Sequence, residues 1–192
     1  TVSWTDGTGT KNTNQQTLEA NRVSVIDLGS VPKSATGLTI SATEPVTAAA
    51  KVTNDGDGDQ ADFALVNASV PMNVSAIAVP DHATAQVSVT NTSDDDRTAT
   101  LTSYNGDGDI VEQSDLTIRA GASTTIELAD INDGDVAAVS LADPDQSMVW
   151  NIRVSQKDVS DAKLAGVSII GATDLKEARE QVWSNQNMTI VR

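Results

Sequence analysis

Two short stretches of the chain carry acidic residues at alternate positions with glycines between them, the pattern that opens many calcium-binding loops. They are Asn54–Asp62 (NDGDGDQAD) and Tyr104–Gln113 (YNGDGDIVEQ). A helix–loop–helix calcium site also needs glycine at the sixth loop position and a bidentate glutamate at the twelfth. Neither stretch meets this requirement, because other residue types hold both positions. They are Gln60 and Val66 in the first loop, and Ile110 and Leu116 in the second.

The second stretch has a sufficient explanation in its backbone. Glycine adopts the positive φ values of tight hairpin turns, and asparagine or aspartate bonds to nearby backbone N–H groups. We therefore interpret Asn105–Asp109 as a turn between two strands. In the first stretch a looser calcium site, with oxygens from loop carboxylates and backbone carbonyls, stays open at Asp55, Asp57 and Asp59, with Asp62 as a further candidate. We expect calcium binding to be weak or absent, and we assign no metal ligand and no cofactor.

Residues that could catalyse a reaction are scarce. His82 is the one histidine, no cysteine is present, and no nucleophile-elbow sequence accompanies a serine. Neither of the glycine-rich phosphate loops, GxxxxGK and GxGxxG, occurs in the chain. The acidic run Asp94–Asp96 is typical of a solvated turn rather than of a tuned pair of acid and base. We expect no catalytic and no cofactor-binding residue, and we classify the protein as a non-enzyme.

Charge and composition narrow the classes of partner. The chain has 12 lysines and arginines against 27 aspartates and glutamates, a net charge of −15, so a nucleic-acid backbone would repel it. No apolar run approaches the roughly 18 residues of a membrane span, and we expect no membrane insertion of this chain. With 192 residues, 39% of them hydrophobic, the chain can bury a core without disulfides or metals. Two domains of about 100 residues fit this length.

Alternation of apolar and polar residues predicts β-strands almost throughout. Met148–Val154 (MVWNIRV) places Met148, Trp150, Ile152 and Val154 on one face, a period of two that suits a strand with one side buried. Similar patterns predict strands at Leu38–Ile40, Gln86–Thr90 and Thr125–Leu128. Turn signals separate the runs at intervals of about 8 to 12 residues, which is the spacing of a sandwich or barrel. The fold class is therefore all-β.

An internal repeat is the most informative feature of the sequence. Thr17–Val31 (TLEANRVSVIDLGSV) aligns without a gap with Thr117–Ile131 (TIRAGASTTIELADI), at an offset of 100 residues. Outside this block the match continues with shifts of one or two residues, as loops of different length allow. The matched segments are Trp4 with Tyr104, Leu38 with Val139, Ala50–Val52 with Ile152–Val154, and Gln86–Val89 with Asn187–Ile190.

The repeat predicts how the chain divides. The first copy begins midway through the unit and lacks a counterpart of Gln86–Thr90, which is found instead at Asn187–Val191 (NMTIV). Without this strand, the first copy would expose an apolar face and an unpaired strand edge. We therefore predict two tandem β-sandwiches of about 100 residues. The second comprises residues 76–173, and the first comprises residues 1–75 plus 174–192, closed by the C-terminal strand.

The order of strands and turns resembles that of a known class of module. The segments VSVTNTSDDDRTATLTSYNGDGD, LTIRAGASTTIEL and AAVSLADPDQSMVWNIRV follow one another as in the immunoglobulin-like repeats of bacterial cell-envelope and secreted proteins. In particular, the chain is similar to an uncharacterised family from actinobacteria. The resemblance implies immunoglobulin-like sandwiches, a secreted or cell-surface location and no functional residue to transfer. The Cys, Trp and Cys arrangement of immunoglobulin domains proper is absent.

We predict a non-catalytic structural or adhesive module of a secreted or cell-envelope bacterial protein, with a protein or glycan partner of unknown identity. The alternative is a carbohydrate-binding module or an accessory domain of a larger extracellular hydrolase. A carbohydrate-binding module would need Trp4, Tyr104 and Trp183 exposed in one plane to stack on sugar rings. Trp150 shares a strand face with Ile152, so we expect it in the core instead.

Overall fold

The computed structural model describes residues 1–5, 11–26, 37–54, 62–80, 84–131, 134–156 and 166–175. In these ranges the chain forms fourteen β-strands and one 3-10 helix, η1 (Leu128–Asp130). Neighbouring strands pair antiparallel in four separate sheets, so the prediction of an all-β fold is confirmed. Among the described residues, no helix is long and apolar enough to cross a membrane.

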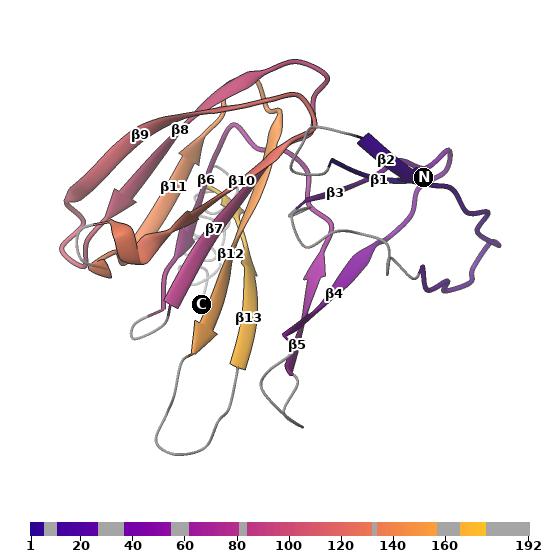
Figure 1. Cartoon of the computed structure of the whole chain (residues 1–192), viewed down its shortest axis with the longest axis horizontal. Coiled ribbons are helices and arrows are strands. Elements are labelled where there is room, and N and C mark those ends of the chain that lie inside the picture. The colour runs from indigo at the N-terminus through magenta and orange to yellow at the C-terminus, as the bar shows by residue number, and fades with distance from the viewer. Residues whose placement is uncertain are drawn as a thin grey trace, which may run out of the picture.

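Two sheets form the larger part of the described structure (Figure 1). One has five strands in the order β14 (Thr173–Asp174), β6 (Val74–Ala78), β11 (Ala138–Ala142), β8 (Arg97–Tyr104) and β9 (Ile110–Ile118). The other has four strands in the order β10 (Ser123–Glu127), β7 (Thr84–Asn91), β12 (Met148–Gln156) and β13 (Gly166–Gly171). Their apolar faces share one core, to which both sheets contribute fully buried residues.

The predicted strand Met148–Val154 lies in β12, at the middle of the four-stranded sheet, and its alternation is confirmed. Its inward side chains Met148, Trp150 and Ile152 are all at most 3% exposed. They pack with Val87 of β7 and with Val139 of the opposite sheet, both fully buried. The indole N–H of Trp150 donates to Ser75 Oγ of β6 over 2.7 Å, which links the two sheets across the core.

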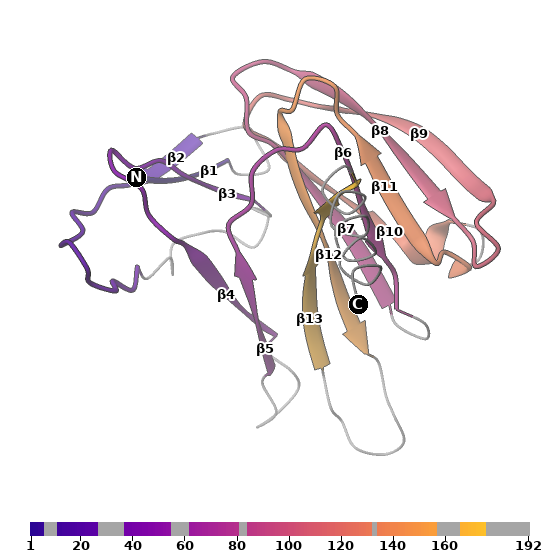
Figure 2. The same cartoon turned by 180° about the vertical axis from the view of Figure 1, so that it is seen from behind.

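The N-terminal part of the chain forms two smaller sheets on the β13 side of this sandwich (Figures 1 and 2). One has three strands in the order β2 (Lys11–Asn14), β1 (Val2–Thr5) and β3 (Leu38–Ile40). The other is a hairpin of β4 (Ala49–Asn54) and β5 (Asp62–Asn67). In both views β4 and β5 lie near β13 and far from β9.

The backbone of Gly37, just before β3, joins the two parts. A Cβ atom built on Gly37 would overlap Thr90 Oγ1 and would come within 2.7 Å of Ser123 Oγ. These two side chains belong to β7 and β10, and their hydroxyl oxygens are themselves hydrogen-bonded over 2.9 Å. Only glycine permits this approach, so the chain entering β3 lies directly against the four-stranded sheet.

One turn has the same backbone geometry in both copies of the sequence repeat. Arg22 N donates to Glu19 O in the first copy (3.3 Å), and Ala122 N donates to Arg119 O in the second (3.0 Å). Each turn contains a residue in the left-handed region, Asn21 with φ 58° and Gly121 with φ 64°. All three pairs of positions differ by 100 in number, so the offset inferred from sequence holds at this turn.

The order of strand pairing also recurs in the two copies. β1 lies between β2 and β3, just as β8 lies between β9 and β11. Trp4 of β1 pairs with Leu38, whereas Tyr104 of β8 pairs with Ala138, the residue before Val139. The expected matches of Trp4 with Tyr104 and of Leu38 with Val139 therefore cannot both hold.

Of the C-terminal region, the structure describes the residues up to Leu175. Thr173 and Asp174 form β14, which pairs with Ala76 and Ser75 of β6. The predicted closing strand Asn187–Val191 lies outside the described residues.

Truncating Ile152 should destabilise the protein by about 2–5 kcal/mol, because a cavity replaces a side chain that is 0% exposed. Urea denaturation of Ile152→Ala, compared with the unaltered chain, measures this loss. The matched control is Ile110→Ala on the edge strand β9, where the side chain is 59% exposed and the loss should stay below about 1 kcal/mol. Equal losses for both variants would contradict the placement of the core.

Candidate functional site

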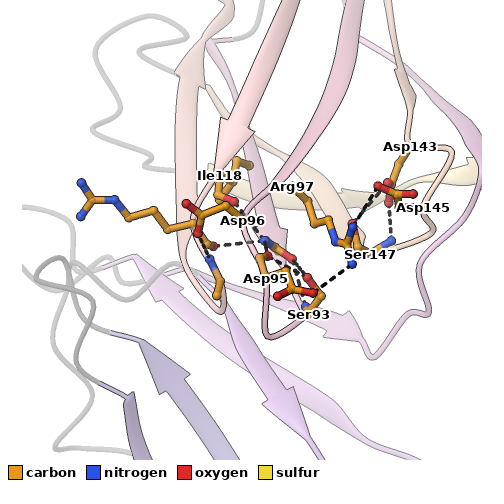
Figure 3. A network of polar contacts seen from close by, with 11 residues as sticks. Ser93, Asp95, Asp96, Arg97, Ile118, Asp143, Asp145 and Ser147 are labelled. Carbon is orange, nitrogen blue, oxygen red and sulfur yellow. Dashed lines mark hydrogen bonds and ion pairs between the residues drawn. The ribbon is translucent and has the colours of Figure 1, made fainter.

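A network of polar contacts lies at one end of the sandwich, where the turn from β7 to β8 meets the turn from β11 to β12 (Figure 3). It contains the acidic run Asp94–Asp96 that the sequence analysis singled out. The network is the best-defined group of chemically capable side chains in the described ranges, and it is therefore the first candidate for a functional site. What these side chains can do depends on which atoms they already bind.

Asn91, the last residue of β7, is 0% exposed and ties three chain segments together. Its Nδ2 donates to the carbonyl oxygens of Asp95 (2.7 Å), Ile118 (3.0 Å) and Arg119 (3.2 Å). Its Oδ1 accepts from the backbone N–H and the hydroxyl of Ser93, at 3.0 and 2.8 Å. The amide thus fixes the β7–β8 turn against the end of β9, and none of its polar atoms is free for a ligand.

Asp143 performs the same task in the turn before β12 and is also 0% exposed. Its Oδ2 accepts from the backbone N–H groups of Ser147 and Met148, each at 2.6 Å, and its Oδ1 accepts from Ser147 Oγ at 3.3 Å. A buried carboxylate is stable only when such donors replace water. Figure 3 shows Asp143 and Ser147 side by side in this turn.

Arg97 links the two turns through their acidic side chains. Its guanidinium lies 3.2 Å from Asp95 and 3.4 Å from Asp145, both largely exposed. The neighbouring Asp96 accepts from Ala120 N at 3.0 Å. Exposed ion pairs of this kind contribute about 0–1 kcal/mol each, so they orient the loop more than they stabilise it. Asp94 is exposed at the tip of the same turn.

The second glycine-rich stretch is a turn, as predicted. Asn105 Oδ1 accepts from Asp107 N at 3.1 Å and from Asp109 N at 2.9 Å, which closes the loop from within. Gly108 has a φ of 86°, a value that favours glycine. In the part of the chain that the structure describes, no group of three or more His, Cys, Asp or Glu side chains could hold a metal ion.

Four other candidates from the sequence lie outside the described residues. They are the calcium candidates Asp55, Asp57 and Asp59, and the single histidine, His82.

The aromatic candidates that the structure describes do not form an exposed row of the kind that sugar stacking requires. Trp4 is only 7% exposed and Trp150 only 3%. Tyr104 is half-buried, with its hydroxyl 3.3 Å from Ser140 Oγ, and Trp183 lies outside the described residues. The burial of Trp150 was predicted, whereas that of Trp4 runs against its proposed place in a sugar-binding platform.

The exposed aromatic side chain of the described ranges is Phe63 of β5, which the sequence analysis did not single out. It is 53% exposed, and Lys51 Nζ of β4 lies 4.5 Å from the centre of its ring. Leu65, two residues further on the same strand face, is 64% exposed. The apolar residues at alternate positions, Phe63 and Leu65, indicate a strand in the sequence. They do not indicate which face of that strand is exposed.

Asp62 anchors this hairpin to the main sandwich. Its Oδ2 accepts from the backbone N–H of Val167 on the edge strand β13, and its Oδ1 accepts from Phe63 N, both at 2.8 Å. The bond from Val167, followed by that from Phe63, lowers the pKa of Asp62 below its ordinary value. Both bonds favour the ionised carboxylate, so the contact depends on pH.

Comparison with known proteins gives a family but no characterised relative. The model of DUF5719, described as a family of unknown function, matches residues 1–129, which is more than half of the chain. The chain therefore belongs to this family. No curated protein and no solved structure matches it significantly. The matched segment runs from β1 to the start of η1 and so spans parts of both copies of the repeat.

Replacing Asn91 should cost about 2–4 kcal/mol, because the carbonyls of Ile118 and Asp95 would lose a buried donor. Thermal or urea unfolding of Asn91→Ala measures the loss. Asn67→Ala, at an exposed position of β5, is the control and should change stability by less than about 0.5 kcal/mol. A loss for Asn91→Ala as small as that of the control would show that the network does not hold the turns.

Acid should release the hairpin at Asp62. Because the folded-state pKa is lowered, the stabilising contribution is present above the ordinary value of 3.8 and is lost as pH falls through the folded-state pKa. Hydrogen-exchange protection of the Val167 amide should therefore persist down to the ordinary value of 3.8 and drop only at lower pH. Asp62→Ala should lower this protection already at neutral pH, whereas Asp107→Ala should not. A pH-independent protection of Val167 would refute the proposed anchor.

Proposed function

We propose that this member of DUF5719 is a non-catalytic structural or adhesive β-sandwich module of a secreted or cell-envelope bacterial protein. The main support for the proposal is that the polar side chains of the best-defined cluster bind the backbone of the protein itself. Asn91 and Asp143 are fully buried, and their hydrogen bonds fix turns of the sandwich. A catalytic acid, base or ligand needs its polar atoms turned toward a substrate, and these are turned toward the backbone.

The arrangement suits passive presentation of a loop. Two hydrogen bonds fix the β7–β8 turn: Asn91 donates to the carbonyl oxygen of Asp95, and Asp96 accepts from Ala120 N. Asp94 is left exposed at its tip. A loop held in one conformation loses little entropy when a partner binds, which favours recognition by a rigid surface.

The immunoglobulin-like character of the two copies is part of the same proposal. Two antiparallel sheets that share a core support a sandwich for the second copy. The repeated turn at Asn21 and Gly121, and the repeated pairing of β1 and β8, support a first copy of the same type. The secreted or cell-surface location follows from the resemblance to bacterial envelope repeats.

A carbohydrate-binding module is the second candidate, and Phe63 is the observation in its favour. Phe63 is exposed beside Lys51, and an exposed aromatic ring can stack on a sugar. The burial of Trp4 weakens this candidate, because a platform of Trp4, Tyr104 and Trp183 was its original basis.

Binding and activity measurements on the purified chain test the proposal. We expect no turnover on a panel of esters, peptides and glycosides. On bacterial cell-wall fractions, we expect either no retention, as for a spacer, or retention that Asp94→Ser weakens and Asp107→Ser leaves unchanged. Asp107 is the matched control because it is an exposed acid in another turn.

Two results would contradict the proposal. Turnover that His82→Ala abolishes would show that the protein is an enzyme. Specific glycan-array hits that Phe63→Ala abolishes and Leu65→Ala retains would establish the carbohydrate-binding alternative.

A further inference from the structure

Asn105 and Gly106 are the chain's one Asn-Gly pair, and they lie in the turn between β8 and β9. An asparagine in this setting can react with its own backbone, because the amide nitrogen of the next residue can attack the side-chain carbonyl carbon. Glycine leaves this approach open, since it has no Cβ. Asparagine is accordingly counted among the thermolabile residues. Whether the reaction takes place depends on what the two reacting groups already bind.

The backbone N–H of Gly106 is available as the nucleophile. Gly106 is exposed to solvent. Its N–H donates to no acceptor in the part of the chain that the structure describes. An amide that faces water can lose its proton to hydroxide, which the attack requires.

The corresponding amide is occupied after two other asparagines. The amide after Asn67 donates to Ala48 O at 2.9 Å, although Asn67 is itself exposed. The amide after the buried Asn91 donates to Ser147 O at 2.7 Å. A hydrogen-bonded amide holds its proton and its position, so we expect both asparagines to be far less reactive than Asn105.

The turn also activates the side-chain carbonyl of Asn105. Its Oδ1 accepts from Asp107 N at 3.1 Å and from Asp109 N at 2.9 Å. Attack on this carbonyl moves negative charge onto Oδ1, and two N–H groups that already point at Oδ1 stabilise the charge, as in an oxyanion hole. In Asn91, by contrast, Nδ2 donates to three carbonyl oxygens, which hold the group that would have to leave.

We propose that Asn105 is a site of spontaneous modification, where the native protein converts asparagine into isoaspartate through a succinimide. The Gly106 nitrogen loses its proton to hydroxide and forms a bond to Cγ of Asn105. The bond from Cγ to Nδ2 breaks, and Nδ2 takes a proton from water and leaves as ammonia. Water then opens the ring at one of its two carbonyl carbons, which gives isoaspartate or aspartate.

The conversion consumes one water, releases one ammonia and requires no oxidant or reductant. It does not depend on the proposed function, because the reacting groups belong to the turn alone.

Isoaspartate changes the shape and the charge of the turn. The main chain then runs through the former side chain, so the turn gains one CH2 group in its backbone and one carboxylate. The former Oδ1 becomes a main-chain oxygen, and its bonds from Asp107 N and Asp109 N are lost. The site lies directly beside the closing pair of the hairpin, Tyr104 with Ile110. The surface at this end of β8 and β9 therefore changes as the protein ages.

Incubation of the full chain in mildly alkaline buffer, followed by peptide mass spectrometry, tests the proposal. We expect the side-chain amide of Asn105 to be replaced by an acid, and an isoaspartyl methyltransferase to label part of the product. Asn67 and Asn91 in the same sample serve as internal controls and should react at least about tenfold more slowly.

A substitution at Gly106 separates this chemistry from general instability. A Cβ on Gly106 would meet no atom within 4 Å, and its φ is outside the left-handed region, so Gly106→Ala should keep the turn. Conversion of Asn105 should fall at least about tenfold, because the added Cβ crowds the approach of the nitrogen to Cγ. The matched control is Gly166→Ala on β13, an equally open site, which should leave the rate unchanged.

Hydrogen exchange of the aged protein gives a second readout. In the converted fraction, the amides of Asp107 and Asp109 should lose protection, because their acceptor is gone. The amides of the central strands β7 and β12 should keep theirs.

Each outcome decides the question. Conversion at Asn105 that is no faster than at Asn67, or that is unchanged in Gly106→Ala, would overturn the proposal. Aspartate without any isoaspartate would indicate direct hydrolysis and would overturn the succinimide route. Unchanged protection of Asp107 and Asp109 after conversion would contradict the role assigned to Oδ1.

Discussion

The structure depends on burying one face of β12 between two sheets. Met148, Trp150 and Ile152 alternate inward along this strand, and each is at most 3% exposed. Because β12 is central, it also sets the position of its neighbours β7 and β13. The turns at its ends need buried donors and acceptors, which explains why Asp143 accepts two backbone N–H groups at 2.6 Å just before the strand begins.

The burial of one face of β12 explains which features of the structure the sequence predicts and which it does not. The alternation in β12 reports burial directly, so the fold class and the core position of Trp150 were predictable. The burial of Trp4 was not predicted, since a strand as short as β1 has too few residues to show a clear alternation. Asp62 was not recognised as an anchor, because its partner Val167 lies 105 positions away and is contacted through its backbone. A hydrogen bond to a backbone N–H does not depend on the residue type of the donor, so the sequence does not indicate it.

The polar network shows why acidic composition is a poor guide to chemistry in this protein. The sequence offers 27 carboxylates, yet those in the network mostly accept from neighbouring donors, as Asp96 does from Ala120 N. Asparagine performs the most connected role, with five hydrogen bonds to the side chain of Asn91. A fixed set of turns at one end of a sandwich is a platform on which loop sequence can change without disturbing the core.

The turn shared by the two copies has a wider consequence. Asn21 and Gly121 differ in side chain but adopt nearly the same left-handed φ, 58° and 64°. The left-handed region is open to glycine and, at a small steric cost, to asparagine, so the two residues are alternative solutions to the same torsion angle. A comparison of the two segments by residue identity alone therefore misses a correspondence that the backbone retains.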